Sequence, residues 1–185
     1  LDAGSARRRG GRPPGPSPRA DKPVPPPSAA ELVRESRRLT LLYATLITAP
    51  DEAHSPVVTR ALESVIDKAR GFGGWVESVR PGSALVVFGI DSAEDAARRA
   101  VHAAVAIRQL AVRARRDDPV RPEVSVAVHT ASLMTLREDR EVTLEPEGMR
   151  TATSVLEALA SRAEPGGVII SGGAAGAILL HELLR

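Results

Sequence analysis

The chain has 185 residues, enough for one ordinary domain and a tail, and its formal charge of +2 is unevenly distributed. Residues 1–30 hold six Lys or Arg and two Asp, so 19 of the 25 basic and 21 of the 23 acidic residues belong to residues 31–185. A mildly acidic domain with few aromatic residues is a poor match for a nucleic-acid groove, and the absence of cysteine excludes disulfides, thiolate metal sites and a cysteine nucleophile.

The first 30 residues are mostly Pro, Gly, Arg, Ala and Ser without an apolar period, so we expect a disordered linker with polyproline character. Residues 31–185 are expected to form one domain. No apolar run approaches the roughly 18 residues of a membrane span, and the start of the chain lacks the apolar core of a signal peptide. We therefore expect a cytoplasmic protein. Because the chain begins with Leu, we also expect it to be a piece of a longer one.

The first predicted elements of the domain are a strand and a helix. Residues 31–38 are polar and predict a short helical lead-in, whereas the apolar run at 39–47 predicts a strong strand. Ser55 followed by Pro56 is typical of a helix start. Apolar residues then recur every three or four positions until Gly71, where this helix is expected to end.

A β-hairpin is predicted next, with strands at 75–79 and 84–88. The connection, residues 80–83, contains Pro and Gly, which favour a tight turn. The second strand is apolar on both faces, as expected for a central strand covered by helices. Trp75 could anchor a dimer interface or be buried between a helix and the sheet.

A capping box at residues 92–95 predicts the start of a long Ala-rich helix whose opposite face carries arginines. The remaining predicted elements are a strand at 124–136, a polar turn at 137–140, a return strand at 141–144, a helix at about 148–163, a strand at 168–171 and a last short helix from Ala174. The order of these elements predicts an α/β (α+β) sandwich, in which helices pack against a mixed sheet.

Five segments of this pattern resemble the catalytic domains of class III adenylate and guanylate cyclases, over about residues 37–184. The segments are 37–44 in the first strand, Gly73-Gly74 with 86–89 in the hairpin, 92–106 in the Ala-rich helix, 126–130 with the sequence Val-Ala-Val-His-Thr, which resembles the family's Gly-Ile-His-Thr-Gly, and 156–160 with 164–171 at the end. Their common order and similar spacing carry the resemblance. It implies a ferredoxin-like βαββαβ cyclase-type domain that works as a dimer.

In that family, one subunit supplies two metal-binding aspartates, and the other supplies an asparagine and an arginine that steady the ribose and the transition state. The resemblance implies that these groups are replaced here. The aspartates correspond to Thr45 and Gly82, the base-selecting lysine and its Asp or Thr partner to Ser78 and Leu144, the asparagine and arginine to Thr151 and Val155, and the phosphate loop to residues 46–50. Thr and Gly are poor substitutes for carboxylates on Mg²⁺, and Val cannot neutralise a phosphate.

The leading interpretation is a catalytically inactive cyclase-homology domain without metal or nucleotide cofactor. It would act as a regulatory, dimerising or partner-binding module of a larger signalling protein. One alternative is an active cyclase, a phosphorus–oxygen lyase that uses Mg²⁺ or Mn²⁺ with ATP or GTP. Its metal would be held by displaced carboxylates such as Asp51, Glu52 or Asp91. A further alternative is a non-catalytic nucleotide or small-ligand sensor that uses the residual cleft.

Other candidate residues favour structural roles. The four histidines lie on separate predicted elements without metal-ligand spacing, so we expect surface or hydrogen-bonded side chains at His54, His102, His129 and His181. Ser171-Gly172-Gly173 has no base nearby in the sequence, so this segment is expected to be a strand-to-helix turn.

Overall fold

A long antiparallel pair of strands runs through the centre of the domain. In the computed structural model, which describes residues 33–138 and 141–176, β1 (Val33–Ile47) pairs with β4 (Glu123–Glu138) from Val33↔Arg137 to Ile47↔Glu123. The helical lead-in expected at 31–38 is therefore wrong for its described part. Residues from 33 onwards extend β1, because the second half of β4 supplies hydrogen-bonding partners along them. The linker expected at 1–30 lies outside the described residues.

The helix and hairpin expected after this strand are confirmed. A short 3-10 helix, η1 (Pro50–Glu52), precedes α1 (Pro56–Gly71), and the Ser55 side chain accepts a hydrogen bond from Val58 N at 3.3 Å. β2 (Trp75–Arg80) and β3 (Ser83–Phe88) form the hairpin. Gly74 is required before it, because an added Cβ would lie 2.5 Å from Val86 Cγ1.

The capping box expected at 92–95 is wrong. α2 (Ala96–Asp117) begins after Asp95, which has a φ of 54° and makes no side-chain cap hydrogen bond. β4 and β5 (Glu141–Leu144) form the expected return pair, although residues 139 and 140 lie outside the described residues. α3 (Pro146–Ala160) and β6 (Val168–Ile170) follow, and the described chain ends in helical residues 172–176.

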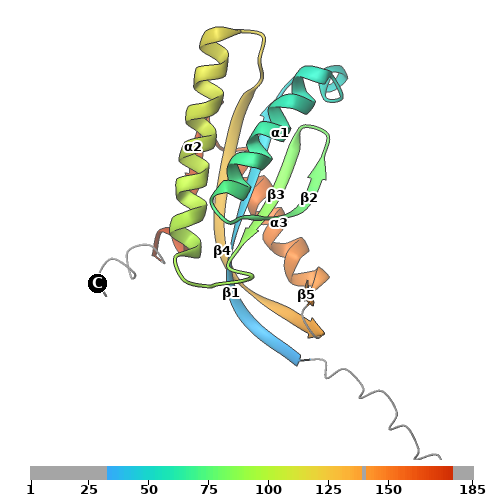
Figure 1. The fold of residues 1–185 in the computed structure, drawn as a ribbon, viewed down its shortest axis with the longest axis vertical. Coiled ribbons are helices and arrows are strands. Elements are labelled where there is room, and N and C mark those ends of the chain that lie inside the picture. The colour runs from blue at the N-terminus through green and yellow to red at the C-terminus, as the bar shows by residue number, and fades with distance from the viewer. Residues whose placement is uncertain (1–32, 139–140, 177–185) are drawn as a thin grey trace, which may run out of the picture. The chain divides into compact units, whose positions relative to one another are not determined.

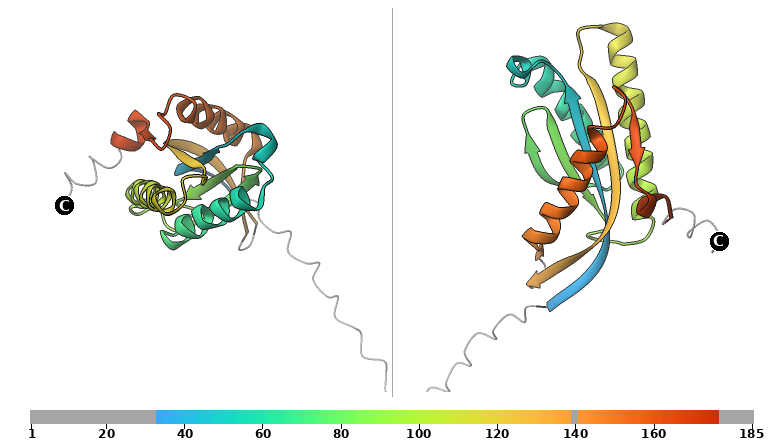
Figure 2. Two further views of the ribbon diagram at one scale, coloured as in Figure 1. Left: turned by 90° about the horizontal axis from the view of Figure 1, so that it is seen from above. Right: turned by 180° about the vertical axis from the view of Figure 1, so that it is seen from behind.

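The six strands form one mixed sheet with helices on both faces, which confirms the predicted architecture (Figure 1). The strand order is β2-β3-β1-β4-β5, and β6 pairs in parallel with β4. Figure 2 shows α1 and α2 on one side of the sheet and α3 on the other. Among the described helices, none is long and apolar enough to cross a membrane.

Each face of the sheet has its own apolar core. Even-numbered positions of β3, such as Val86, pack with α1 and α2, whereas odd-numbered positions, such as Val87, pack with α3. All of β3 is buried, as expected for a central strand. Of the two alternatives for Trp75, burial between a helix and the sheet is wrong, because the side chain is 48% exposed on the outer strand β2 and the helices pack mainly over the inner strands. A role in a dimer interface stays a prediction.

The central position of β3 predicts a large difference between two valine substitutions in the hairpin. Val87 is fully buried, so Val87→Asp places an unpaired charge in the core and should lower the free energy of unfolding by more than about 3 kcal/mol. Val79 is 53% exposed on β2, so Val79→Asp should change it by less than about 1 kcal/mol. Urea unfolding of both variants checks this, and similar stabilities would contradict the assignment of β3 as the central strand.

Candidate functional site

The two positions that the resemblance assigns to metal-binding aspartates lie side by side at one end of the sheet. Thr45 is the register partner of Ser83 across the β1–β3 pair, and Leu46 N donates a hydrogen bond of 2.7 Å to Gly82 O. Gly82 has a φ of 73°, and the nearest atom to an added Cβ is Leu46 O at 3.9 Å. This end of the sheet therefore presents hydroxyl groups and open space around the Gly82 turn.

The carboxylates proposed as displaced metal ligands do not converge on this end of the sheet. Asp51 and Glu52 are exposed in η1, close in sequence to the end of β1. Asp91 follows Ile90, whose carbonyl oxygen accepts a 2.7 Å hydrogen bond from Arg37 Nη1. Because Arg37 precedes Thr45 by eight residues of one strand, Asp91 is roughly 26 Å from the Thr45 end. The described residues contain no cluster of three or more His, Asp and Glu that could hold a metal ion.

The base-selecting positions lie in different surroundings. Ser78, on β2, lines a pocket of about 410 Å³ between this strand and α3. Leu144, at the end of β5, is buried in the core beneath α3 and pairs with Thr135. Only Ser78 of these two positions therefore lines the pocket, and Leu144 has a packing role.

The transition-state positions lie on the outer surface of α3, one helical turn apart. Thr151 is exposed, and its hydroxyl donates a 3.1 Å hydrogen bond to Glu147 O of the same helix. Val155 is 38% exposed. Neither side chain can supply a positive charge to a partner across this surface.

The pocket beside Ser78 contains charges that largely balance one another. Arg80 Nη1 lies 3.3 Å from Glu157 Oε1, an exposed ion pair that joins β2 to α3. Arg150 and Glu77 also line the pocket, and burial raises the pKa of the Glu77 carboxyl above its ordinary value. A pocket lined by two arginines and two glutamates can accept a polar ligand, but it has no net positive charge to attract a phosphate.

One polar pair was missed from the sequence. The expectation that Ser171 has no base nearby is wrong, because His129 Nδ1 lies 2.9 Å from Ser171 Oγ. The parallel pairing of β6 with β4, which sets Val128 opposite Ile170, brings these side chains together. The strand-to-helix turn is nevertheless confirmed, since Ser171 Oγ also accepts a 3.4 Å hydrogen bond from Ala174 N.

The histidines have the surroundings expected for structural residues. His54 and His102 are exposed, His129 is hydrogen-bonded, and His181 lies outside the described residues. Burial lowers the pKa of the His129 imidazole below its ordinary value of 6.5. In the tautomer that carries its proton on Nε2, the neutral ring can accept a hydrogen bond from the Ser171 hydroxyl at Nδ1, while the hydroxyl oxygen accepts the hydrogen bond from Ala174 N.

His129 should therefore make the domain less stable in mild acid. Its pKa is lower in the folded state, so the unfolded chain binds the proton first, and stability present above pH 6.5 is lost as the pH falls towards the folded-state pKa. Glu77 acts with the opposite sign because its pKa is raised. In urea unfolding between about pH 5 and about pH 7.5, His129→Asn should lose less stability on acidification than the unchanged protein. An equal loss of stability in the variant and in the unchanged protein would contradict the role of His129 in the pH dependence.

Comparison with known proteins shows likeness at the level of three-dimensional structure. No protein-family model matches the sequence, and no curated protein is similar to it. The monomeric guanylyl cyclase domain of the RhoGC fusion protein from the aquatic fungus Blastocladiella emersonii is 14% identical, with a TM-score of 0.62 over 80% of this chain and 88% of that chain. A dimeric form of that guanylyl cyclase domain gives 14% identity and a TM-score of 0.59, covering 81% of this chain and 87% of that chain.

An adenylyl cyclase, CyaB from P. aeruginosa, is 19% identical, with a TM-score of 0.57 over 80% of this chain and 83% of that chain. These alignments cover most of both chains. Identities this low establish a common fold rather than a common activity. The domain therefore has the fold of adenylyl and guanylyl cyclase catalytic domains.

Proposed function

We propose that this domain is a member of the class III cyclase family that has lost catalysis and acts by dimerising or by binding a protein partner within a larger signalling protein. The observation that supports this most strongly is that Thr45 and the Gly82–Ser83 turn lie together at one end of the sheet and bring no carboxylate there. Two Mg²⁺ ions in a phosphoryl-transfer site need carboxylate oxygens, and these positions carry hydroxyl groups and a glycine. The alternative carboxylates of Asp51 and Glu52 are exposed in η1, and the described residues contain no group of three or more His, Asp and Glu that could hold a metal ion.

Dimerisation does not restore such a site. In a composite site of the family's type, each metal half faces the transition-state half of the partner subunit. Thr151 and Val155 would face Thr45 and Gly82, so both halves lack their charged groups. Arg150 is adjacent to Thr151, but it lines the pocket beside Ser78, and its charge cannot replace the missing metal ligands.

Calorimetric titration with non-hydrolysable ATP and GTP analogues in the presence of Mn²⁺ tests this proposal. The unchanged domain should give no metal-dependent heat. The double variant Thr45→Asp, Gly82→Asp should gain Mn²⁺ binding, because the space around Gly82 admits a Cβ and the positive φ costs an Asp only about 1 kcal/mol.

Thr59→Asp is the control for this titration, since it adds a carboxylate at an exposed position of α1. It should leave Mn²⁺ binding absent. Metal-dependent nucleotide binding by the unchanged domain would contradict the proposal and restore the active-cyclase reading with displaced ligands.

A second candidate is a non-catalytic sensor of a small polar ligand. The pocket of about 410 Å³ between β2 and α3 supports it, because this volume is within the range of ordinary ligand sites. The charges of the two arginines and two glutamates in its lining cancel, which favours a zwitterionic or neutral polar ligand over a nucleoside triphosphate. Binding of a nucleotide analogue without metal in the same titration would argue against this ligand class.

The proposed dimer should depend on the exposed surface of α3. Val155→Glu places a charge on this surface, and if the surface is buried between subunits the dimer dissociation constant should rise at least tenfold, measured by sedimentation equilibrium. Val57→Glu is a matched control, since Val57 is 42% exposed on α1 and Val155 is 38% exposed. Equal effects of the two substitutions, or no effect of Val155→Glu, would show that α3 is not the interface.

A further inference from the structure

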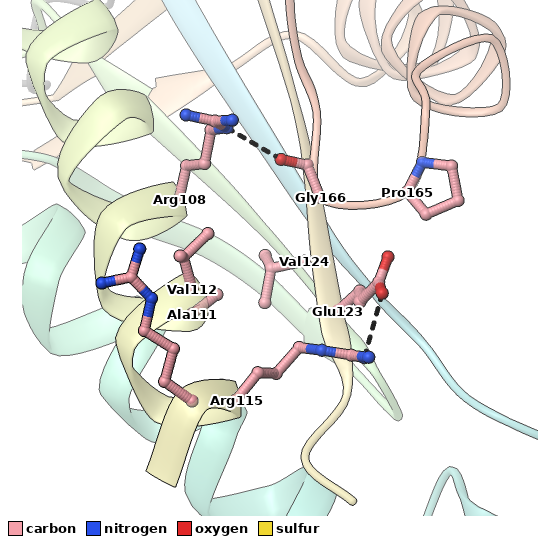
Figure 3. Close-up of a pocket in the computed structure, with 9 residues that line it drawn as sticks. Arg108, Ala111, Val112, Arg115, Glu123, Val124, Pro165 and Gly166 are labelled. Atoms are coloured by element: carbon pink, nitrogen blue, oxygen red, sulfur yellow. Dashed lines mark hydrogen bonds and ion pairs between the residues drawn. The ribbon is translucent and has the colours of Figure 1, made fainter. Parts of the chain in front are cut away.

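Arginine side chains surround a pocket of about 290 Å³ on the face of the sheet that α2 covers (Figure 3). The pocket lies between the second half of α2, the start of β4 and the turn at 164–166. Thr45 lies on the α3 face, because its neighbours Ala44 and Leu46 point to the other face. The pocket is thus separate from the positions discussed above, and the inference does not rest on the proposed function.

Two of the guanidinium groups are oriented by the protein itself. Arg108 Nε donates a hydrogen bond of 3.1 Å to Gly166 O. Arg115 Nη1 lies 3.1 Å from Glu123 Oε1 (Figure 3). It also donates a 3.2 Å hydrogen bond to Arg121 O. These contacts use only part of the donors of each guanidinium, which has five N–H groups. The remaining donors are available to a ligand on side chains whose orientation is already restricted.

The charge around this pocket is unbalanced. Arg108, Arg115 and Arg116 line it, against Glu123 as the acidic group of the lining. Within the described part of the chain, Arg116 makes no hydrogen bond or ion pair. Arg115 and Arg116 lie in the last turn of α2, where cations interact favourably with the helix dipole. That effect does not account for Arg108, which is two helical turns earlier and is directed to the same pocket.

The rest of the lining is apolar. Ala111 and Val124 are buried, and Val112 is 38% exposed beside them. A volume of about 290 Å³ is at the lower end for a small-molecule site. Guanidinium groups beside a small apolar surface suit a ligand that has an anionic head and a compact apolar body.

We propose that this pocket binds a small organic anion. Arg108, Arg115 and Arg116 hold its phosphate or carboxylate group, and Ala111 and Val124 contact its apolar body. A planar guanidinium can donate two parallel hydrogen bonds to two oxygen atoms of either a phosphate or a carboxylate group. The ligand class is therefore an organic phosphate or carboxylate with few heavy atoms.

A titration of the ¹⁵N-labelled full chain, followed by backbone amide shifts, tests the proposal. Phenyl phosphate should give saturable shifts at Val112, Glu123 and Gly166. Benzoate in a parallel titration distinguishes a carboxylate site from a phosphate site. Benzyl alcohol, which has the apolar body without the charge, should bind at least tenfold more weakly than the better anion. Absence of saturation for both anions, or shifts confined to other regions, would overturn the proposal.

Two arginine variants separate a built site from general attraction to a basic helix. Arg116→Gln should weaken binding of the preferred anion at least tenfold while leaving thermal unfolding unchanged, since Arg116 supports no described contact. Arg113→Gln removes the same charge from an exposed position of α2 that does not line the pocket, and it should change the affinity less than twofold. Equal weakening by the two substitutions would overturn the proposal.

Discussion

The pairing of β1 with β4 is the interaction on which the rest of the domain depends. It is antiparallel over the whole length of β1, and apolar residues cover both faces of the pair. At its centre the hydroxyls of Thr40 and Thr130 hydrogen-bond to each other at 2.9 Å, so these buried polar groups are satisfied. The pair places the end of β1 beside the hairpin turn on one side and the start of β4 on the other. It thereby fixes both the Thr45 position and the entrance of the arginine-lined pocket.

This arrangement explains how the proposed replacement of catalytic groups would leave the fold intact. The two cores consist mainly of apolar side chains from the sheet and from α1, α2 and α3, and Ala174 adds to the core on the α2 side. The positions assigned to catalysis are mostly elsewhere: Gly82 is in a turn, and Thr151 and Val155 are on the outside of α3. Changing them therefore costs little folding free energy. Leu144 is the exception, since it adds an apolar side chain to the core beneath α3.

Local signals in the sequence predicted most of the elements correctly. Residues within a short segment explain three of them: the helix start at Ser55-Pro56, the turn at Pro81-Gly82 and the buried strand β3, whose residues 84–88 are apolar. Features that depend on distant partners were not predictable in this way. The polar residues after Val33 become a strand only because β4 extends beside them, and α2 begins at Ala96, after the segment in which the capping box was expected.

The candidate sites also differ in whether local sequence or distant partners determine them. The family resemblance identified Thr45 and Gly82, but their adjacency depends on the antiparallel pairing of β1 with β3, which the structure shows. The His129–Ser171 pair and the pocket around Arg108 and Arg115 required knowledge of how β6 and the 164–166 turn pack against β4 and α2. No local pattern in the sequence joins segments so far apart.

If the domain keeps the cyclase fold without catalysis, it should form no cyclic nucleotide, and product formation measures this directly. Mass spectrometry of cyclic nucleotide, followed over hours with Mn²⁺ and either ATP or GTP at several protein concentrations, would detect even very slow turnover. We expect no product above a blank without protein at any protein concentration. Product that increases linearly with both time and protein concentration would contradict it.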